Sequence, residues 1–196
     1  MKRCFDLLFS TSGLFLLSPI FLIIASVIKL LMPGPVIFTQ KRIGKNSKEF
    51  MLFKFRTMVV KSGTQRGSFD AGDASRITPI GRLLRKTKLD ELPQLFNVLK
   101  GDMSFVGPRP EIEKWTKYYP EKWQLVHTVK PGITDNASLL FRNEEIILAQ
   151  SENPEKIYRD EILPQKLDLY ISYVNEQSLL IDIKIILKTL YEVITK

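Results

Sequence analysis

Cysteine and histidine are almost absent from this sequence. Cys4 and His127 are the single residues of their types among 196. A single cysteine excludes an intrachain disulfide framework. With only one cysteine and one histidine, the chain also lacks the ligands for zinc sites of four cysteines or of two cysteines and two histidines, and for the usual multi-histidine metal centres. With 44% apolar and 26% charged residues, the chain is also neither a collagen-like fibre nor a disordered tail. Its length predicts one domain with at most a small annex.

Acidic residues are scarce in the first half of the chain. Residues 1–100 hold 17 Lys and Arg against 6 Asp and Glu, whereas residues 101–196 hold 12 against 15. The net charge of +8 therefore belongs to the first half, where basic residues are spread among apolar ones. A basic surface indicates nucleic acid, a membrane surface or a phosphorylated substrate as partner. A merely solvated basic face explains the charge equally well.

Charge is missing altogether from Leu7 to Ile28. As one helix this run would reach about 33 Å, enough to cross a bilayer, and it lacks the cleavage site of a signal peptide. A spanning helix is one alternative. Against it, Ser18-Pro19 breaks the helix near its middle, and basic residues flank both ends although positive charge prefers one side. These flanking residues are Lys2, Arg3, Lys29, Lys41, Arg42, Lys45 and Lys48. A re-entrant helix broken at Ser18-Pro19 is favoured, and a buried core helix is disfavoured because the run is apolar on every side.

Turn and periodicity signals give the remaining elements. A hairpin is predicted within residues 36–56, with its turn at 44–47, and a glycine-rich loop over 62–76. Helices are predicted over 79–85, 91–100, 110–126, 143–151, 154–172 and 178–195. In helix 110–126, Trp115, Tyr118, Tyr119 and Trp123 alternate with lysines, which suits either a headgroup layer or ordinary core packing. The last helix is amphipathic and suits packing on the domain or on lipid. The fold class is α+β and mainly helical.

Two adjacent carboxylates, Asp90 and Glu91, open the predicted helix 91–100. Simple helix capping is the first explanation of such a pair. The neighbouring residues favour a binding site over simple capping, because basic residues lie on both sides of the pair in the sequence. These residues are Arg82, Arg85, Lys86, Lys88 and Arg109. Carboxylates among cations suit a site for a hard divalent metal and a phosphorylated substrate. A structural ion pair is the alternative for Arg109.

These residues resemble the bacterial sugar transferases, the monotopic phosphoglycosyl transferases. The resemblance covers nearly the whole catalytic core in order. Its segments are the apolar hairpin with Ser18-Pro19, Gly34–Gln40, Lys54–Met58, Leu89–Leu99, Gly101–Pro110 and Lys130–Thr134. It implies a re-entrant membrane helix over 1–32, cytoplasmic at both ends, and a catalytic domain over 33–196 at the cytoplasmic face of the bacterial inner membrane, with amphipathic interfacial helices around the active site. From this resemblance we expect the minimal catalytic form, without extra membrane helices before residue 1.

The resemblance also implies a ping-pong reaction. Asp90 would attack the β-phosphate of a UDP-sugar, release UMP and carry a covalent phosphosugar, which polyprenyl (undecaprenyl) phosphate then accepts as the first membrane step of surface glycan or glycoconjugate synthesis. Glu91 would complete the dyad, and Mg²⁺ held partly by Asp90 would neutralise the diphosphate. Arg109, Arg85 and Arg56 would bind phosphate groups. Membrane lipid is then an expected partner and nucleic acid is not.

The sequence departs from the commonest family pattern after Thr134. Many members continue Gly-Leu-Ala-Gln, whereas this chain runs from Asp135 to Arg142 as Asp-Asn-Ala-Ser-Leu-Leu-Phe-Arg and continues into a longer helical insert near 143–168. The departure points to the sugar pocket. The alternative from another class is a non-catalytic, membrane-anchored basic adaptor, for which Asp90 has no special role.

Overall fold

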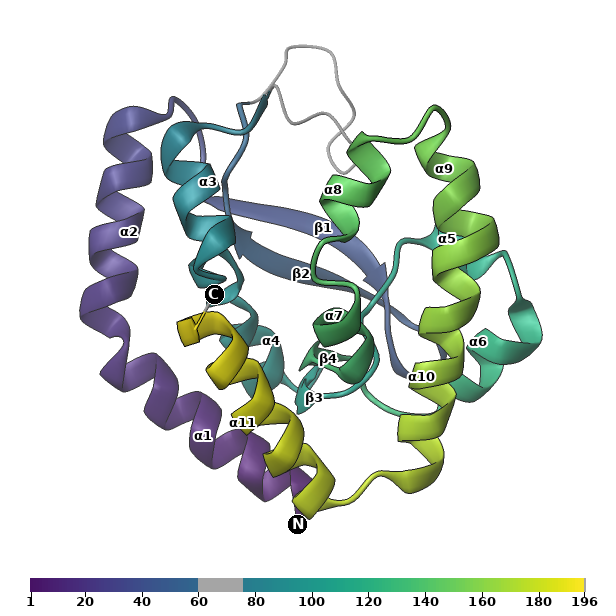
Figure 1. Cartoon of the computed structure of the whole chain (residues 1–196). Helices are drawn as coiled ribbons and strands as arrows, with labels where there is room; N and C mark the ends of the chain where they lie inside the picture. Colours follow the sequence, from purple (N-terminus) through teal and green to yellow (C-terminus); the bar gives the residue numbers. More distant parts are fainter. Residues whose placement is uncertain (60–75, 196) are drawn as a thin grey trace.

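The computed structural model describes residues 1–59 and 76–195 and is mainly helical (Figure 1). The α-helices are α1 (Lys2–Leu16), α2 (Ser18–Leu31), α3 (Pro79–Lys86), α4 (Gln94–Lys100), α5 (Glu113–Thr116), α6 (Pro120–Val126), α7 (Asn136–Leu140), α8 (Glu144–Ala149), α9 (Pro154–Ile157), α10 (Leu163–Glu176) and α11 (Leu179–Thr195). Tight turns form η1 (Lys45–Ser47) and η3 (Leu89–Glu91), and the π-turn η4 (Tyr158–Ile162) joins α9 to α10. The predicted mainly helical α+β class is confirmed.

Two small sheets complete the fold. Strands β1 (Ile37–Ile43) and β2 (Glu49–Phe55) pair antiparallel, with Ile37 opposite Phe55, as the predicted hairpin requires. The turn at Lys45–Ser47 lies where it was expected. A second sheet pairs β3 (Ser104–Val106) with β4 (Gly132–Thr134) in parallel. Both of its strands are too short for a hydrophobic alternation to reveal them in the sequence.

Helices α1 and α2 form a bent pair. Their axes differ by 60° across Leu17, so the helix break expected at Ser18-Pro19 is confirmed. Pro19 lies in the first turn of α2, where its missing N–H costs nothing. Within the described residues, neither helix alone is long and apolar enough to cross a membrane, but the two together meet that test. Membrane insertion of the pair stays a prediction.

The two helices of this pair contact the rest of the protein differently. Helix α2 buries Ile24 and Ile28, which pack with Phe55 of β2 and Leu84 of α3 in one hydrophobic cluster. The fully buried side chains of α1 are polar. Large apolar side chains along both helices are exposed, among them Leu8, Phe9, Phe15, Leu16, Leu22, Ile23, Leu30 and Leu31. The pair therefore exposes many large apolar side chains.

Proline moves two of the predicted helix boundaries. The helix expected over 91–100 begins only at Gln94, because Pro93 has no N–H to donate and the chain before it forms the tight turn η3, in which the Leu92 N–H bonds to the Leu89 carbonyl oxygen. The helix expected over 110–126 is two short helices, α5 and α6, separated at Tyr119, which has a left-handed backbone (φ 58°) before Pro120. These boundaries of the predicted helices were wrong. The predicted loop 62–76 lies, apart from Arg76, outside the described residues.

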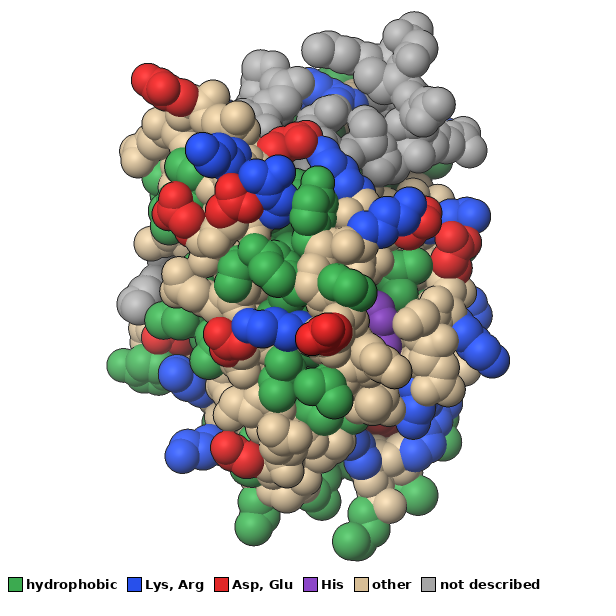
Figure 2. Space-filling view, turned by 90° about the vertical axis from the view of Figure 1, so that its right-hand side faces the viewer, with side chains coloured by type: hydrophobic (Ala, Val, Ile, Leu, Met, Phe, Trp, Pro, Cys, Tyr) green, Lys and Arg blue, Asp and Glu red, His purple; other side chains and the backbone are tan. Residues whose placement is uncertain are grey.

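The C-terminal half has its own hydrophobic core. Trp115 and Trp123 are 1% and 2% exposed and pack against η4 and α10, so core packing explains these tryptophans and a headgroup layer does not. On the face that carries α9 and α10, Lys and Arg side chains are intermixed with Asp and Glu (Figure 2). Helix α11 instead exposes Ile183, Leu187 and Leu190 while burying Ile185. Its apolar face is thus largely uncovered.

Candidate active site

The Asp90–Glu91 pair lies in the tight turn η3 between α3 and α4. Lys88, with a left-handed backbone (φ 57°), ends α3 abruptly, and Pro93 follows the pair. The flanking Leu89 and Leu92 pack against the α2–β2–α3 cluster. The acidic pair is therefore fixed from both sides by apolar anchors, and it precedes α4 instead of opening it.

Glu91 accepts from two cations that come from distant parts of the chain. Its Oε1 lies 2.6 Å from Lys54 Nζ on β2 and 2.7 Å from Arg109 Nη2, which follows β3. Burial alone would raise the pKa of Glu91, but the charges of Arg109 and Lys54 outweigh it and hold this pKa well below its usual value. Glu91 in turn holds the pKa of Arg109 well above its usual value. This carboxylate is an ionised anchor for both cations.

Asp90 has the opposite environment. It is 7% exposed, and its Oδ1 is buried without a hydrogen-bond partner among the described residues. Burial raises the pKa of Asp90, and the nearby charge of Lys54 opposes that rise. An unsatisfied buried oxygen is costly unless a ligand completes it. Asp90 is therefore the group of this pair that is open to chemistry.

A magnesium ion fits this arrangement. The described residues contain no group of three or more His, Cys, Asp or Glu side chains that would hold a metal by themselves. Mg²⁺ commonly binds through one or two carboxylates together with substrate phosphates and water. The unpartnered Asp90 Oδ1 is a suitable protein ligand of that kind. Mg²⁺ itself remains a prediction.

The predicted phosphate-binding arginines occupy two places. Arg85 donates through Nε to Thr57 Oγ1 at 3.1 Å, and its charge acts on Asp90, so it lies near the acidic pair together with Arg109. Arg56 instead donates to the carbonyl oxygens of Met32 and Pro33 at 2.6 and 2.7 Å. This contact ties β2 to the end of α2. A phosphate-binding role for each of the three stays a prediction.

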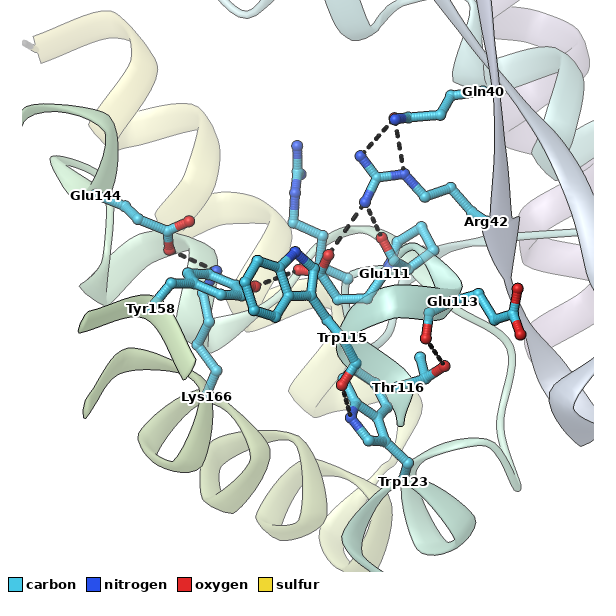
Figure 3. Close-up of polar contacts among 12 residues, drawn as sticks. Gln40, Arg42, Glu111, Glu113, Trp115, Thr116, Trp123, Glu144, Tyr158 and Lys166 are labelled. Carbon is cyan, nitrogen blue, oxygen red and sulfur yellow. Dashed lines mark hydrogen bonds and ion pairs between the residues drawn. The ribbon is translucent and has the colours of Figure 1, made fainter. Parts of the chain in front are cut away.

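A largely buried polar network surrounds Glu111 (Figure 3). Glu111 accepts hydrogen bonds from Arg42 Nη1 at 3.1 Å and from the Tyr158 hydroxyl at 2.6 Å. Through these two contacts it connects β1 with η4. Lys166 of α10, 3% exposed, pairs with Glu144 of α8 at 2.5 Å. The sequence reasoning missed this network and Lys54. Lys54 had one signal, its position in the Lys54–Met58 segment.

The segment that departs from the family pattern forms α7. Asp135 caps it, with Oδ1 accepting from the Ser138 backbone N–H at 2.8 Å. Arg142 just beyond it donates to the Glu192 carbonyl of α11 at 2.6 Å. Asp135 is 2% exposed, and its charge acts on Arg109. The departure is therefore next to the acidic pair's arginine and fastens α7 to α11.

The family model described as bacterial sugar transferase matches residues 1–196. The chain belongs to this family. It is 37% identical over 196 residues to the UDP-glucose:undecaprenyl-phosphate glucose-1-phosphate transferase of Escherichia coli (strain K12), covering 98% of this chain and 40% of that protein. It is 35% identical over 198 residues to the UDP-N-acetylgalactosamine-undecaprenyl-phosphate N-acetylgalactosaminephosphotransferase of Aeromonas hydrophila, covering 100% of this chain and 44% of that protein.

A shorter relative matches along most of its length. The uncharacterized sugar transferase EpsL of Bacillus subtilis (strain 168) is 40% identical over 197 residues, covering 99% of this chain and 87% of that protein. The chain thus spans less than half of the first two relatives and most of the third. The family resemblance inferred from the sequence motifs is confirmed.

Proposed function

We propose that this chain transfers a sugar-1-phosphate from a UDP-sugar to polyprenyl phosphate and releases UMP. The observation that carries the proposal is the buried Asp90 carboxylate, whose Oδ1 has no partner among the described residues, beside cations anchored by Glu91. Carboxylates serve as covalent nucleophiles toward phosphoryl groups. The names of the relatives, which include undecaprenyl-phosphate sugar-phosphate transferases, support the same reaction.

The proposed reaction has two displacements at one phosphorus atom. An Asp90 oxygen forms a bond to the β-phosphorus of the UDP-sugar, the bond to the bridging oxygen breaks, and UMP leaves with the electron pair. An oxygen of polyprenyl phosphate then attacks the same phosphorus, the bond to Asp90 breaks, and the carboxylate is regenerated. The product is a polyprenyl diphosphate sugar.

Charge placement does most of the catalytic work in such a transfer. Arg109 and Lys54, both held by Glu91, and Arg85 face the negative phosphates as they bind. Glu91 stays ionised because its pKa is held low, so it assists acceptor and metal through the cations it positions. Asp90 would hold Mg²⁺, which would supply further neutralisation of the diphosphate.

We infer that the bent α1–α2 pair enters one leaflet of the bacterial cytoplasmic membrane and returns, with residues 33–196 on the cytoplasmic face. The exposed apolar side chains of both helices support this, because soluble proteins rarely expose large contiguous apolar patches. Lys2 and Lys29, near opposite ends of the pair, favour the same side of the membrane. The polyprenyl tail then stays in lipid while its phosphate reaches Asp90.

The decisive experiment mixes the purified chain in lipid nanodiscs with Mg²⁺, undecaprenyl phosphate and a panel of UDP-sugars, including UDP-glucose and UDP-N-acetylgalactosamine, and measures UMP. We expect UMP release with at least one sugar, and without acceptor a phosphosugar adduct in the intact mass. Asp90→Asn is expected to lose both. Asp160→Asn, an exposed acidic residue paired with Arg159, is the matched control and keeps both.

Two results contradict the proposal. Absence of UMP with every sugar favours a non-catalytic adaptor, and full turnover by Asp90→Asn removes the covalent role of this residue. UMP release without an adduct, with Asp90→Asn inactive, replaces the covalent route by direct transfer.

A further inference from the structure

Helix α1 buries the carboxylate of Asp6 although it exposes several large apolar side chains. Asp6 is 2% exposed, whereas Leu8 and Phe15 are 64% and 79% exposed. Burying a carboxylate is costly unless hydrogen bonds compensate it. The contacts that compensate Asp6 lead directly toward the proposed active site.

Asp6 holds the strand that leads to Arg109. Its Oδ1 accepts from the Ser104 hydroxyl at 2.9 Å and from the Phe105 backbone N–H at 3.1 Å. Both residues belong to β3, and the chain runs from β3 through Gly107 to Arg109. One carboxylate oxygen of α1 therefore fixes the start of the arginine-bearing segment.

Arg3, one turn earlier, holds the helix that follows the acidic pair. Its Nη1 and Nη2 donate to the carbonyl oxygens of Val98 and Leu99 at 2.6 and 2.9 Å. The last carbonyls of a helix have no partner within it, and a positive charge there is favourable. Helix α4 begins at Gln94, close behind Glu91, so Arg3 holds the C-terminal end of the helix that follows the acidic pair.

Lys2 adds a contact to the far end of β3. Its Nζ lies 2.9 Å from the Tyr173 hydroxyl and pairs with Asp182. The same hydroxyl lies 3.2 Å from the Val106 carbonyl oxygen. Contacts through three α1 residues thus reach α4 and both ends of β3.

We propose that the N-terminal turns of α1 are a positioning element for the active site, with Asp6 as its principal positioning residue. By holding β3 and α4 against one helix, they set the separation of Arg109 from Glu91, whose contact is 2.7 Å. The inference rests on the proposed function, because it assigns Asp6 a role in that reaction. It also makes α1 at once the helix exposed to lipid and the frame of the site.

The test uses the full chain in nanodiscs and compares Asp6→Ala with Asp6→Asn. We expect Asp6→Ala to lower kcat about tenfold with KM for the UDP-sugar within about twofold, because a displaced catalytic group costs rate more than ground-state binding. Asp6→Asn keeps an accepting Oδ1 and is expected to remain within about threefold of the unmodified chain. Cys4→Ala, exposed on the same turn, is the matched control and leaves kcat unchanged.

A double-mutant cycle separates positioning from general damage to the fold. If Asp6 acts through Arg109, then Asp6→Ala costs less than about twofold when Arg109 is already alanine. Equal losses with and without Arg109 overturn the inference. A loss of kcat that is fully accounted for by a lower folded fraction, measured from thermal unfolding, also overturns it.

Hydrogen exchange tests the positioning contact without relying on turnover. Asp6→Ala is expected to speed amide exchange across residues 104–109, including the Phe105 N–H, which donates a hydrogen bond to Asp6. Cys4→Ala is expected to leave this exchange unchanged. Unchanged exchange overturns the inference whatever the activity. Faster exchange together with no UMP release from the unmodified chain rejects the proposed function and leaves the contact between α1 and β3 supported.

Discussion

At the scale of single residues, the surroundings of the two neighbouring carboxylates shift their pKa values in opposite directions. Glu91 is held ionised by Arg109 and Lys54, whereas burial raises the pKa of Asp90. Pairs of titratable groups whose environments separate their pKa values typically mark a division of chemical roles. This difference supports the proposed division, in which Glu91 anchors the cations and Asp90 reacts.

Lys54 connects the two roles, and replacing it gives a pH-dependent prediction. Attack requires ionised Asp90, so turnover rises with pH as this group loses its proton. Since the Lys54 charge lowers the pKa of Asp90, Lys54→Met is expected to raise that pKa and move the acidic limb of the kcat–pH profile to higher pH. We also expect a roughly 100-fold lower kcat at pH 7 from the lost charge near the phosphates.

The matched control is Lys41→Met on β1, whose lysine is exposed and pairs with Glu49 at 2.9 Å. Its profile is expected to coincide with that of the unmodified chain. A Lys54→Met variant with a lower kcat but an acidic limb at the unchanged pH would contradict the proposed effect on the pKa of Asp90.

The sequence singled out the residues of the candidate site but not the contacts that they make in the structure. Asp90, Glu91 and Arg109 were identified because they are charged residues in an extended family motif. That Glu91 pairs with Lys54 depends on how β2 lies against η3, and no local pattern encodes such a contact. Asp6 was missed for the same reason, because its partners in β3 are distant along the chain.

At the scale of elements, the sequence predicted helix boundaries well where a local capping signal sets them. Helix α3 matches its expected range, since Thr78 caps it by accepting from the Gly81 N–H at 3.0 Å. The helices expected over 91–100 and 110–126 were wrong at their boundaries, where Pro93 and Tyr119 determine the backbone. The small β3–β4 sheet is set by tertiary contacts and has no comparable signal in sequence.

Glycine in α3 gives a prediction about how this helix is seated. A methyl group on Gly81 would lie 2.0 Å from the Thr57 carbonyl oxygen, a backbone atom that cannot step aside. Gly81→Ala is therefore expected to destabilise the protein by about 1–3 kcal/mol and lower its melting temperature. It should also displace Arg85, which donates to Thr57, and reduce turnover.

Gly13 of α1 is the matched control for this substitution. Its added methyl group would meet Leu95 Cδ1 at 3.4 Å, an ordinary contact. Alanine within a helix is favoured over glycine by up to about 1 kcal/mol, so Gly13→Ala should keep or raise the melting temperature. Equal melting temperatures for the two variants would show that α3 is not packed against Thr57 as described.

At the scale of the whole molecule, exposed large apolar side chains are frequent on the first two helices and on the last one. The face of α9 and α10 mixes acidic and basic side chains (Figure 2), whereas α1, α2 and α11 expose leucine, isoleucine and phenylalanine. Helix α11 starts beside the beginning of α1, where Lys2 pairs with Asp182 (Figure 1), and it exposes Leu187 and Leu190. In the membrane placement that we propose, the exposed apolar side chains of these helices face the bilayer.

The direction of the α1–α2 pair can be tested with the chain's single cysteine, because Cys4 is exposed at the start of α1. A re-entrant pair places Cys4 on the cytoplasmic side together with the catalytic domain. A membrane-impermeant maleimide should then label Cys4 in inverted vesicles and not in intact spheroplasts, with total reactivity measured after denaturation. The matched probe is Lys117→Cys in a Cys4→Ser background. Lys117 follows α5, its side chain is 70% exposed, and the introduced cysteine should be labelled from the same side as Cys4.

Labelling of Cys4 from the outside and of residue 117 from the inside would make residues 7–28 a spanning helix. The bend at Leu17 would then lie within a single crossing.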